Sequence, residues 1–365
     1  MRKIILTLIV CVIALMVGEV VLRSILFSSV SYSNSESIDK QLEERNAHSD
    51  WNILFIGDSE TRWGINPEVI DAEFSAVGLH ARSFNHAFDG FGASWWPRLL
   101  PNLLAEPALK NVQYVVVGVQ MIDVHRQVRA TGEDCGALQK PVLTSPFAKD
   151  LAVDALCRDQ SWDARLADDL FDKFWLVRHA SSVRSLMLPD FRNASQQLRF
   201  NSRKSGEPVR GFEPHRSIAE DKESFESEFA RWKAQYNSEL DFRPLPEGAW
   251  PKLTAQGEFF DQLNATVREQ GRSMVLFALP TNPLLIDTFK RRADYLKNSN
   301  LLHVWAKKNG VVFIDKGMQD VAEPEIYFSD MRHLSGEGAR QYSIKLGQEM
   351  VNKGILRINA VNTKK

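Results

Sequence analysis

The feature that most limits the fold of this chain is a series of short apolar runs that alternate with amphipathic segments. Segments with helical periodicity separate these runs. Apolar strands that alternate with helices are typical of a parallel sheet covered on both faces. We therefore expect an α/β fold, whose ligand site lies at the carboxyl ends of the strands. The predicted strands are residues 53–57, 82–86, 112–118, 273–279 and 311–314.

Local signals place helices between the strands. Asn66 followed by Pro67 predicts an N-cap and a first helical residue, with a helix to Phe74. Further helices are predicted at about 94–104 and 283–308, and a closing helix at 336–352.

The alternation is lost between Asp123 and Trp250, where the chain is charged and broken by Pro and Gly. Helical patches are predicted at 162–177 and 218–240. Long segments of this kind inside a domain are usually functional lids or poorly ordered linkers. We expect a large, mostly helical insertion at about 124–250 that covers the site or carries a partner surface.

The N-terminus is predicted to be a membrane anchor at residues 1–26. Arg2 and Lys3 precede an uncharged run that extends to Gly18. A helix over residues 4–22 spans roughly 28 Å, close to the thickness of the hydrocarbon core. A signal peptide has a similar start, but no Ala-x-Ala-like cleavage site follows, so a retained single-pass anchor is favoured.

The positive end of this anchor is expected in the cytoplasm, which places the body on the periplasmic or outer side of the cytoplasmic membrane. Residues 27–50 are polar and are predicted to form a stalk, partly helical from Ser37 to Ala47. The globular domain is predicted to span residues 51–365.

Charge and cysteine content exclude several functions. The chain has 45 Lys and Arg residues against 46 Asp and Glu residues, so no global field attracts nucleic acid. The three cysteines, Cys11, Cys135 and Cys157, show no CxxC spacing, so neither a zinc site nor a thioredoxin-like site is indicated. In an exported body, Cys135 and Cys157 form a disulfide or remain two thiols, and both alternatives stay open.

The first candidate motif, Gly57-Asp58-Ser59-Glu60, directly follows a predicted buried strand. Gly57 permits a sharp turn that presents Ser59 at the carboxyl edge of the sheet. A serine hydroxyl is a poor nucleophile unless a base removes its proton. Alone, therefore, the motif also fits a helix cap.

The second motif places Asp330 and His333 three residues apart, just before a helix that Ser335 can cap. At this spacing the carboxylate can accept a hydrogen bond from the imidazole and stabilise the imidazolium. His333 then acts as general base and afterwards as general acid. Together the motifs predict a Ser59–His333–Asp330 triad, which needs neither a metal nor a cofactor.

The two motifs resemble those of the SGNH (GDSL-type) hydrolase family. In that family the catalytic Ser lies in a Gly-Asp-Ser block near the start of the domain, and the catalytic Asp and His lie in an Asp-x-x-His block near its end. Residues 56–67 and 330–339 are similar to the membrane-anchored bacterial branch, which includes alginate O-acetylation and teichoic acid D-alanyl transfer proteins. The resemblance covers residues 51–122 and 270–350. It implies a three-layer, flavodoxin-like parallel sheet, interrupted here by the insertion and preceded by a transmembrane helix.

The resemblance also implies an oxyanion hole made by the backbone N–H of Ser59, by Gly90 and by Gln120, with Gly92 as a second choice for the glycine. Gln120 stands where the family has Asn, and its longer side chain shifts the donor. Loss of one such donor typically costs a factor of about 10² to 10³ in rate. The departure thus counts against efficient hydrolysis, and because this block is often degenerate in acyltransferase relatives, the resemblance mildly favours acyl transfer.

Asp58, Arg62 and Arg332 flank the motifs and are predicted to bind substrate, although capping is the alternative. The resemblance implies O-acyl transfer, most simply of acetyl, or ester hydrolysis on a cell-envelope polysaccharide or small ester. It also implies an acylated donor or a membrane protein that delivers the acyl group, and no nucleic-acid partner. The alternative is a non-catalytic scaffold or glycan-binding component of an envelope assembly.

Overall fold

The structure, a computed structural model, describes only part of the chain. The described residues are 41–89, 96–121, 205–230 without 207, 224 and 228, 259–317 without 289 and 291, and 323–356. All of them belong to one compact unit. The predicted anchor and the two cysteines Cys135 and Cys157 lie outside these residues. None of the helices that the structure describes is long and apolar enough to cross a membrane.

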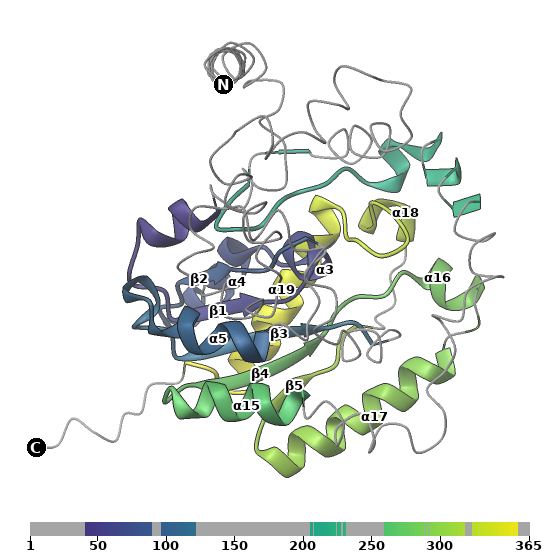
Figure 1. Cartoon of the computed structure of the whole chain (residues 1–365). Coiled ribbons are helices and arrows are strands. Elements are labelled where there is room, and N and C mark those ends of the chain that lie inside the picture. The colour runs from purple at the N-terminus through teal and green to yellow at the C-terminus, as the bar shows by residue number, and fades with distance from the viewer. Residues whose placement is uncertain are drawn as a thin grey trace, which may run out of the picture. The chain divides into compact units, whose positions relative to one another are not determined.

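Five parallel strands form one sheet in the order β2-β1-β3-β4-β5, which Figure 1 shows at the centre of the molecule. This is the order of flavodoxin-like doubly wound sheets. Each strand overlaps one predicted run, so the α/β class and the parallel sheet are confirmed. The strands are β1 (Ile53–Ile56), β2 (Ser83–Asn85), β3 (Tyr114–Val119), β4 (Ser273–Ala278) and β5 (Val312–Ile314).

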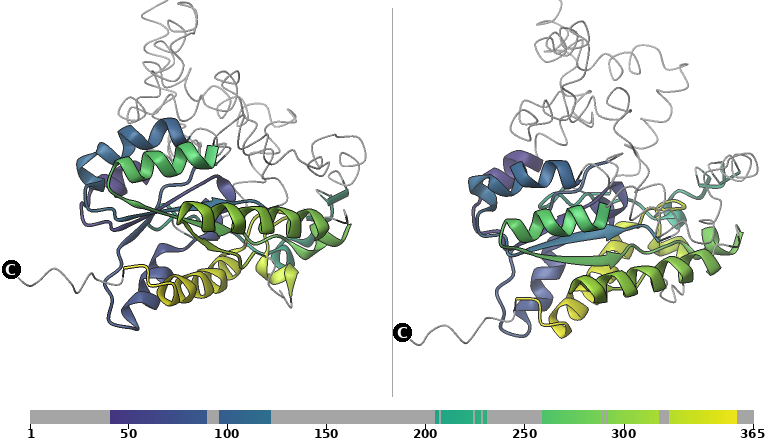
Figure 2. Two further views of the ribbon diagram at one scale, coloured as in Figure 1. Left: turned by 90° about the horizontal axis from the view of Figure 1, so that it is seen from below. Right: turned by 60° about the horizontal axis from the view of Figure 1, so that its bottom comes forward.

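Helices cover both faces of the sheet, which is why the strands are almost entirely apolar (Figure 2). α4 (Pro67–Ser75) and α19 (Gly336–Asn352) pack together on one face. α5 (Trp96–Ala105) and α15 (Phe259–Glu269) pack together on the other. The remaining elements are α3 (Ser59–Gly64), η2 (Pro107–Leu109), η4 (Ile218–Glu220), α16 (Pro283–Thr288), α17 (Arg292–Asn309) and α18 (Pro324–Tyr327).

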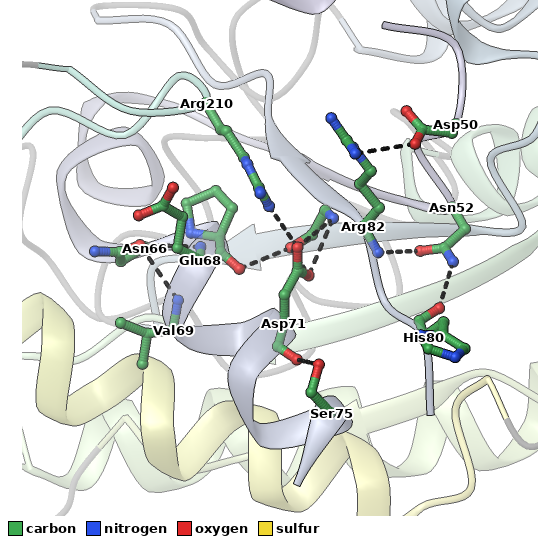
Figure 3. Close-up of polar contacts among 12 residues, drawn as sticks. Asp50, Asn52, Asn66, Glu68, Val69, Asp71, Ser75, His80, Arg82 and Arg210 are labelled. Atoms are coloured by element: carbon green, nitrogen blue, oxygen red, sulfur yellow. Dashed lines mark hydrogen bonds and ion pairs between the residues drawn. The ribbon is translucent and has the colours of Figure 1, made fainter. Parts of the chain in front are cut away.

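The capping signals were good predictors of helix ends. The Asn66 side chain accepts hydrogen bonds from the backbone N–H groups of Glu68 and Val69, as Figure 3 shows, and so caps α4. The single helix predicted at 283–308 is instead two helices, α16 and α17. Between them Lys290 has a φ of 52°, a left-handed conformation that a continuous helix does not contain.

The predicted stalk boundary at residue 50 is wrong, because residues 41–50 belong to the globular body. Residues 41–46 are helical, and Leu42 is 0% exposed. The Gln41 side chain donates to the carbonyl of Asn85 at 2.6 Å, and buried Arg45 pairs with Glu106. This short helix carries a single fully buried apolar side chain among polar ones, so its composition alone suggested a solvated segment.

Part of the predicted insertion at 124–250 belongs to the globular body. Residues 205–220 pack within the body, with Phe212 and Ile218 buried in its core. The predicted helix at 218–240 begins as a short 3-10 turn, η4, which a Ser217–Glu220 capping box stabilises.

If residues 41–46 are part of the core, Leu42→Ala will lower the free energy of unfolding by about 2–5 kcal/mol, because it removes buried methyl groups and leaves a cavity. Denaturant titration of the full-length protein measures this. Glu43→Ala, at an exposed position in the same helix, is the matched control and should change stability by less than about 0.5 kcal/mol. Equal stabilities of the two variants would contradict the assignment.

Candidate active site

The position of Ser59 is set by a very close approach between α3 and the sheet. β1 ends at Ile56, and Asp58 caps α3 by accepting a hydrogen bond from the backbone N–H of Glu60. A Cβ atom at Gly57 would lie 2.1 Å from Thr61 Oγ1, and one at Gly118 would lie 2.2 Å from it. Only glycine fits at both places, so the first turn of α3 lies directly against the carboxyl ends of β1 and β3.

Ser59, His333 and Asp330 form a continuous hydrogen-bonded series. Ser59 Oγ lies 2.9 Å from His333 Nε2. On the other side of the ring, His333 Nδ1 lies 2.8 Å from Asp330 Oδ2 and 3.0 Å from Oδ1. The carboxylate holds the proton on Nδ1, which leaves Nε2 as the acceptor for the serine hydroxyl. The structure thus brings together three residues from the two predicted motifs, which are separated by most of the chain.

The loop that carries Asp330 and His333 is held by its own backbone. Asp330 Oδ1 accepts hydrogen bonds from the backbone N–H groups of Arg332 and His333, each at 2.7 Å. The buried amide of Asn282, just after β4, donates to the carbonyl of Asp330 at 3.1 Å. The loop ends at Ser335, whose hydroxyl caps α19. The two N–H groups therefore oppose rotation of the carboxylate, while Asn282 holds the backbone of the loop.

The charges around His333 favour its protonated form. Burial lowers the pKa of His333, but the charge and hydrogen bond of Asp330, with the charges of Glu60 and Asp89, outweigh burial and raise it above the ordinary value of about 6.5. Burial likewise raises the pKa of the Asp58 carboxyl, although the His333 charge and the N–H of Glu60 oppose the shift. A base with these neighbours is suited to accept a proton and to stabilise the resulting imidazolium.

Trp63 lies one helical turn after Ser59, and its ring packs against the imidazole of His333. Its ring is fully buried, and its centroid lies 4.1 Å from that of His333. The ring of His215 also stacks on Trp63, with a centroid distance of 3.5 Å and an interplanar angle of 15°. Residues four apart lie on one face of a helix, so the Ser59–Trp63 spacing was a usable sequence signal. His215 had none, because the predicted insertion shows no strand rhythm.

Arg62, which we expected to face the substrate, is instead buried and 2% exposed. Its two terminal nitrogens donate to Asp89 at 3.0 Å and to Glu213 at 2.7 Å. Asp89 also accepts a hydrogen bond from the Trp63 indole N–H at 3.0 Å. Burial of a guanidinium requires such carboxylate partners. Arg62 therefore binds neighbouring side chains inside the body and does not face solvent.

Glu60 joins two residues for which we predicted other roles. Gln120, predicted to donate to an oxyanion, is buried and donates through Nε2 to Glu60 Oε2 at 2.6 Å. Arg332, predicted to bind substrate, lies 3.4 Å from Glu60 Oε1 as an ion pair and is 14% exposed. The bond to Glu60 uses one of the two N–H groups of the Gln120 amide. Glu60 was part of the first motif, but its side chain was given no role.

Of the other residues near the ends of the strands, one is described and the rest are not. His86 is fully buried, and burial together with the charge of Arg45 holds its pKa well below the ordinary value, so it is neutral. Gly90 and Gly92, the two choices for the oxyanion glycine, and Asp123 and His125 after β3 lie outside the described residues.

Within the part of the chain that the structure describes, no group of His, Cys, Asp and Glu side chains is arranged to hold a metal ion. No protein-family model matches this chain. A comparison with curated proteins finds no significant match either. Any functional assignment therefore depends on the geometry of the site and on its motifs.

Asp330 is expected to raise the pKa of His333 against the opposing effect of burial. In the full-length protein, the His333 ring signals in a histidine-selective NMR titration should have a midpoint above about 6.5. In Asp330→Asn the midpoint should fall, because the favourable charge is lost while burial still opposes protonation. A midpoint that stays the same in Asp330→Asn would contradict this account, and Asp50→Asn, at an exposed position, serves as the control.

Proposed function

We propose that this protein is a serine-dependent O-acyltransferase or esterase of the SGNH type, in which Ser59 is the nucleophile. The observation that carries the proposal is the series Ser59 Oγ, His333 Nε2, His333 Nδ1 and Asp330 Oδ2, with successive contacts of 2.9 and 2.8 Å. Nucleophile, base and orienting carboxylate lie within hydrogen-bond reach, as covalent catalysis requires. The strand order and the place of Ser59 at the carboxyl end of β1 support the same assignment.

The chemistry follows from these contacts. Ser59 Oγ attacks the carbonyl carbon of an ester while its proton passes to His333 Nε2. The bond to the leaving alkoxide breaks, and the alkoxide takes the proton from His333, which leaves an acyl-Ser59 ester. An acceptor hydroxyl, or water, then gives its proton to His333 and attacks the acyl carbon. Ser59 recovers its proton as the new ester or the free acid departs.

The proposed acyl group is acetyl, and the proposed acceptor is a hydroxyl of a cell-envelope polysaccharide. The motif resemblance to membrane-anchored transfer proteins supports this choice, as does the apolar run at residues 4–22. The same resemblance supports a body outside the cytoplasm and a membrane partner that delivers the acyl group. The Gln120–Glu60 hydrogen bond engages one N–H of an amide expected to stabilise the oxyanion, which would slow transfer and hydrolysis alike.

That hydrogen bond also motivates the alternative, a scaffold or glycan-binding module in which the triad is unused. The two proposals differ in one measurable property, the reactivity of the Ser59 hydroxyl. A serine that is activated by its base reacts with phosphonates and acetyl esters, whereas an unactivated one does not.

We expect the full-length protein to hydrolyse a chromogenic acetyl ester and to be labelled by a fluorophosphonate at Ser59. Ser59→Ala should abolish labelling and lower kcat/KM by at least about 10⁴-fold, because the nucleophile is lost. Mass spectrometry of the labelled peptide identifies the site. Added oligosaccharide should accept acetyl groups if transfer is the natural reaction.

Ser75→Ala is the matched control, since Ser75 is an exposed helical serine in α4, away from the triad. It should label and turn over at the wild-type rate. Absence of both labelling and turnover in the wild-type protein would sink the catalytic proposal and favour the scaffold.

The rate should depend on pH through His333. Only the neutral imidazole can accept the Ser59 proton, and its pKa is raised. The value of kcat/KM should therefore fall as the pH drops through a midpoint above about 6.5, and it should reach a plateau at higher pH. An acid limb with a midpoint well below this value would show that another group, or no group, limits the rate.

A further inference from the structure

Residues 205–220, here called the return arm, lie within the predicted insertion at 124–250 but are bonded to the body along their length. The backbone N–H of Asn85, at the end of β2, donates to the carbonyl of Arg210 at 2.9 Å. Further along the arm, the N–H of Gly336 donates to the carbonyl of His215 at 2.7 Å. The N–H of Ile218 donates to the carbonyl of Phe328, also at 2.7 Å. The arm thus joins the edge of the sheet to both ends of the loop that carries Asp330 and His333.

A tight turn fixes the start of the arm. Arg210 and Gly211 have φ values of 47° and 80°, and Val209 pairs with Phe212 across the turn. A Cβ atom at Gly211 would lie 1.8 Å from the carbonyl oxygen of Asn85, so the arm approaches β2 as closely as a backbone can. The Arg210 guanidinium pairs with Asp71 of α4, as Figure 3 shows.

Two side chains of the arm extend toward the site. Glu213 is buried and accepts a 2.7 Å bond from Arg62, the residue that also holds Asp89. His215 stacks on Trp63, and the His333 ring also contacts Trp63. Glu213 and His215 therefore reach two successive residues of α3, and Trp63 links the arm to the proposed base.

We propose that His215 is a positioning residue, which acts through Trp63 to hold the His333 imidazole in line with Ser59 and Asp330. This proposal rests on the proposed function. The Trp63 ring is fixed at its N–H by Asp89 and on its face by His215. Trp63 in turn limits the tilt of His333, whose Nε2 must stay within hydrogen-bond reach of Ser59. Small misplacements of a catalytic group lower the rate strongly.

The test compares His215→Leu with His215→Phe in the full-length protein. Leucine fills the buried space without a flat ring, whereas phenylalanine keeps the stack on Trp63. We expect His215→Leu to lower kcat for the acetyl ester by about 10- to 100-fold with KM unchanged. His215→Phe should recover most of the lost rate. Arg216→Ala, at an exposed position in the same arm, is the matched control and should leave both constants unchanged.

A second readout does not depend on activity. The ring current of Trp63 displaces the ring-proton NMR signals of His333, which are assigned by their loss in His333→Gln. In His215→Leu the chemical shifts of these protons should move toward those of a free histidine in solution. In His215→Phe and Arg216→Ala they should keep their wild-type values.

The two readouts separate the two proposals. If the wild-type protein neither hydrolyses the ester nor reacts with a phosphonate, the proposed function is contradicted. The NMR signals of His333 then still test the role of His215. If His215→Leu retains both the wild-type signals and the wild-type rate, the positioning role is overturned. A rate that falls equally in His215→Leu and His215→Phe would also overturn it, because the flat ring would then not matter.

Discussion

The site depends on the close packing of α3 against the ends of two neighbouring strands. The register of β1 and β3 pairs Ile56 with Val117, so Gly57 and Gly118 follow side by side. The Thr61 side chain occupies the space that their missing side chains leave. Any larger residue at either position would displace the first turn of α3, and with it the hydroxyl of Ser59. The 2.9 Å contact to His333 is therefore set by backbone packing in the sheet and not by the triad residues alone.

Around this framework, the charges are arranged in pairs. Three carboxylates act on His333: Asp330 by direct contact, and Glu60 and Asp89 through their fields. Glu60 is matched by Arg332, and Asp89 by Arg62, so the two outlying carboxylates keep a cationic partner despite their burial. A buried carboxylate without such a partner tends to become protonated and loses its field. The arginines beside the two motifs thus contact the acidic neighbours of His333 rather than His333 itself.

Much of the fold was predictable because its signals are local. Apolar runs marked the five strands of the sheet, Asn66 and Ser335 marked the starts of two helices, and the two short motifs contained the three residues of the hydrogen-bonded series. The misassigned parts depend on contacts between distant residues. Arg62 is polar in sequence, but its burial requires Asp89 and Glu213, the latter from a segment without strand rhythm. Likewise, residues 41–46 look solvated until their packing against Asn85 and Glu106 is known.

The return arm is held on the sheet by its own bonds to the body. The described chain stops at Met121, whose carbonyl accepts a 2.6 Å bond from Asn298, and resumes at Ser205, whose N–H donates to Pro214 at 3.0 Å. Both attachment points are thus bonded within the body. The bonds that hold the return arm on the sheet lie within the described body, so its position does not depend on how many residues separate Met121 from Ser205.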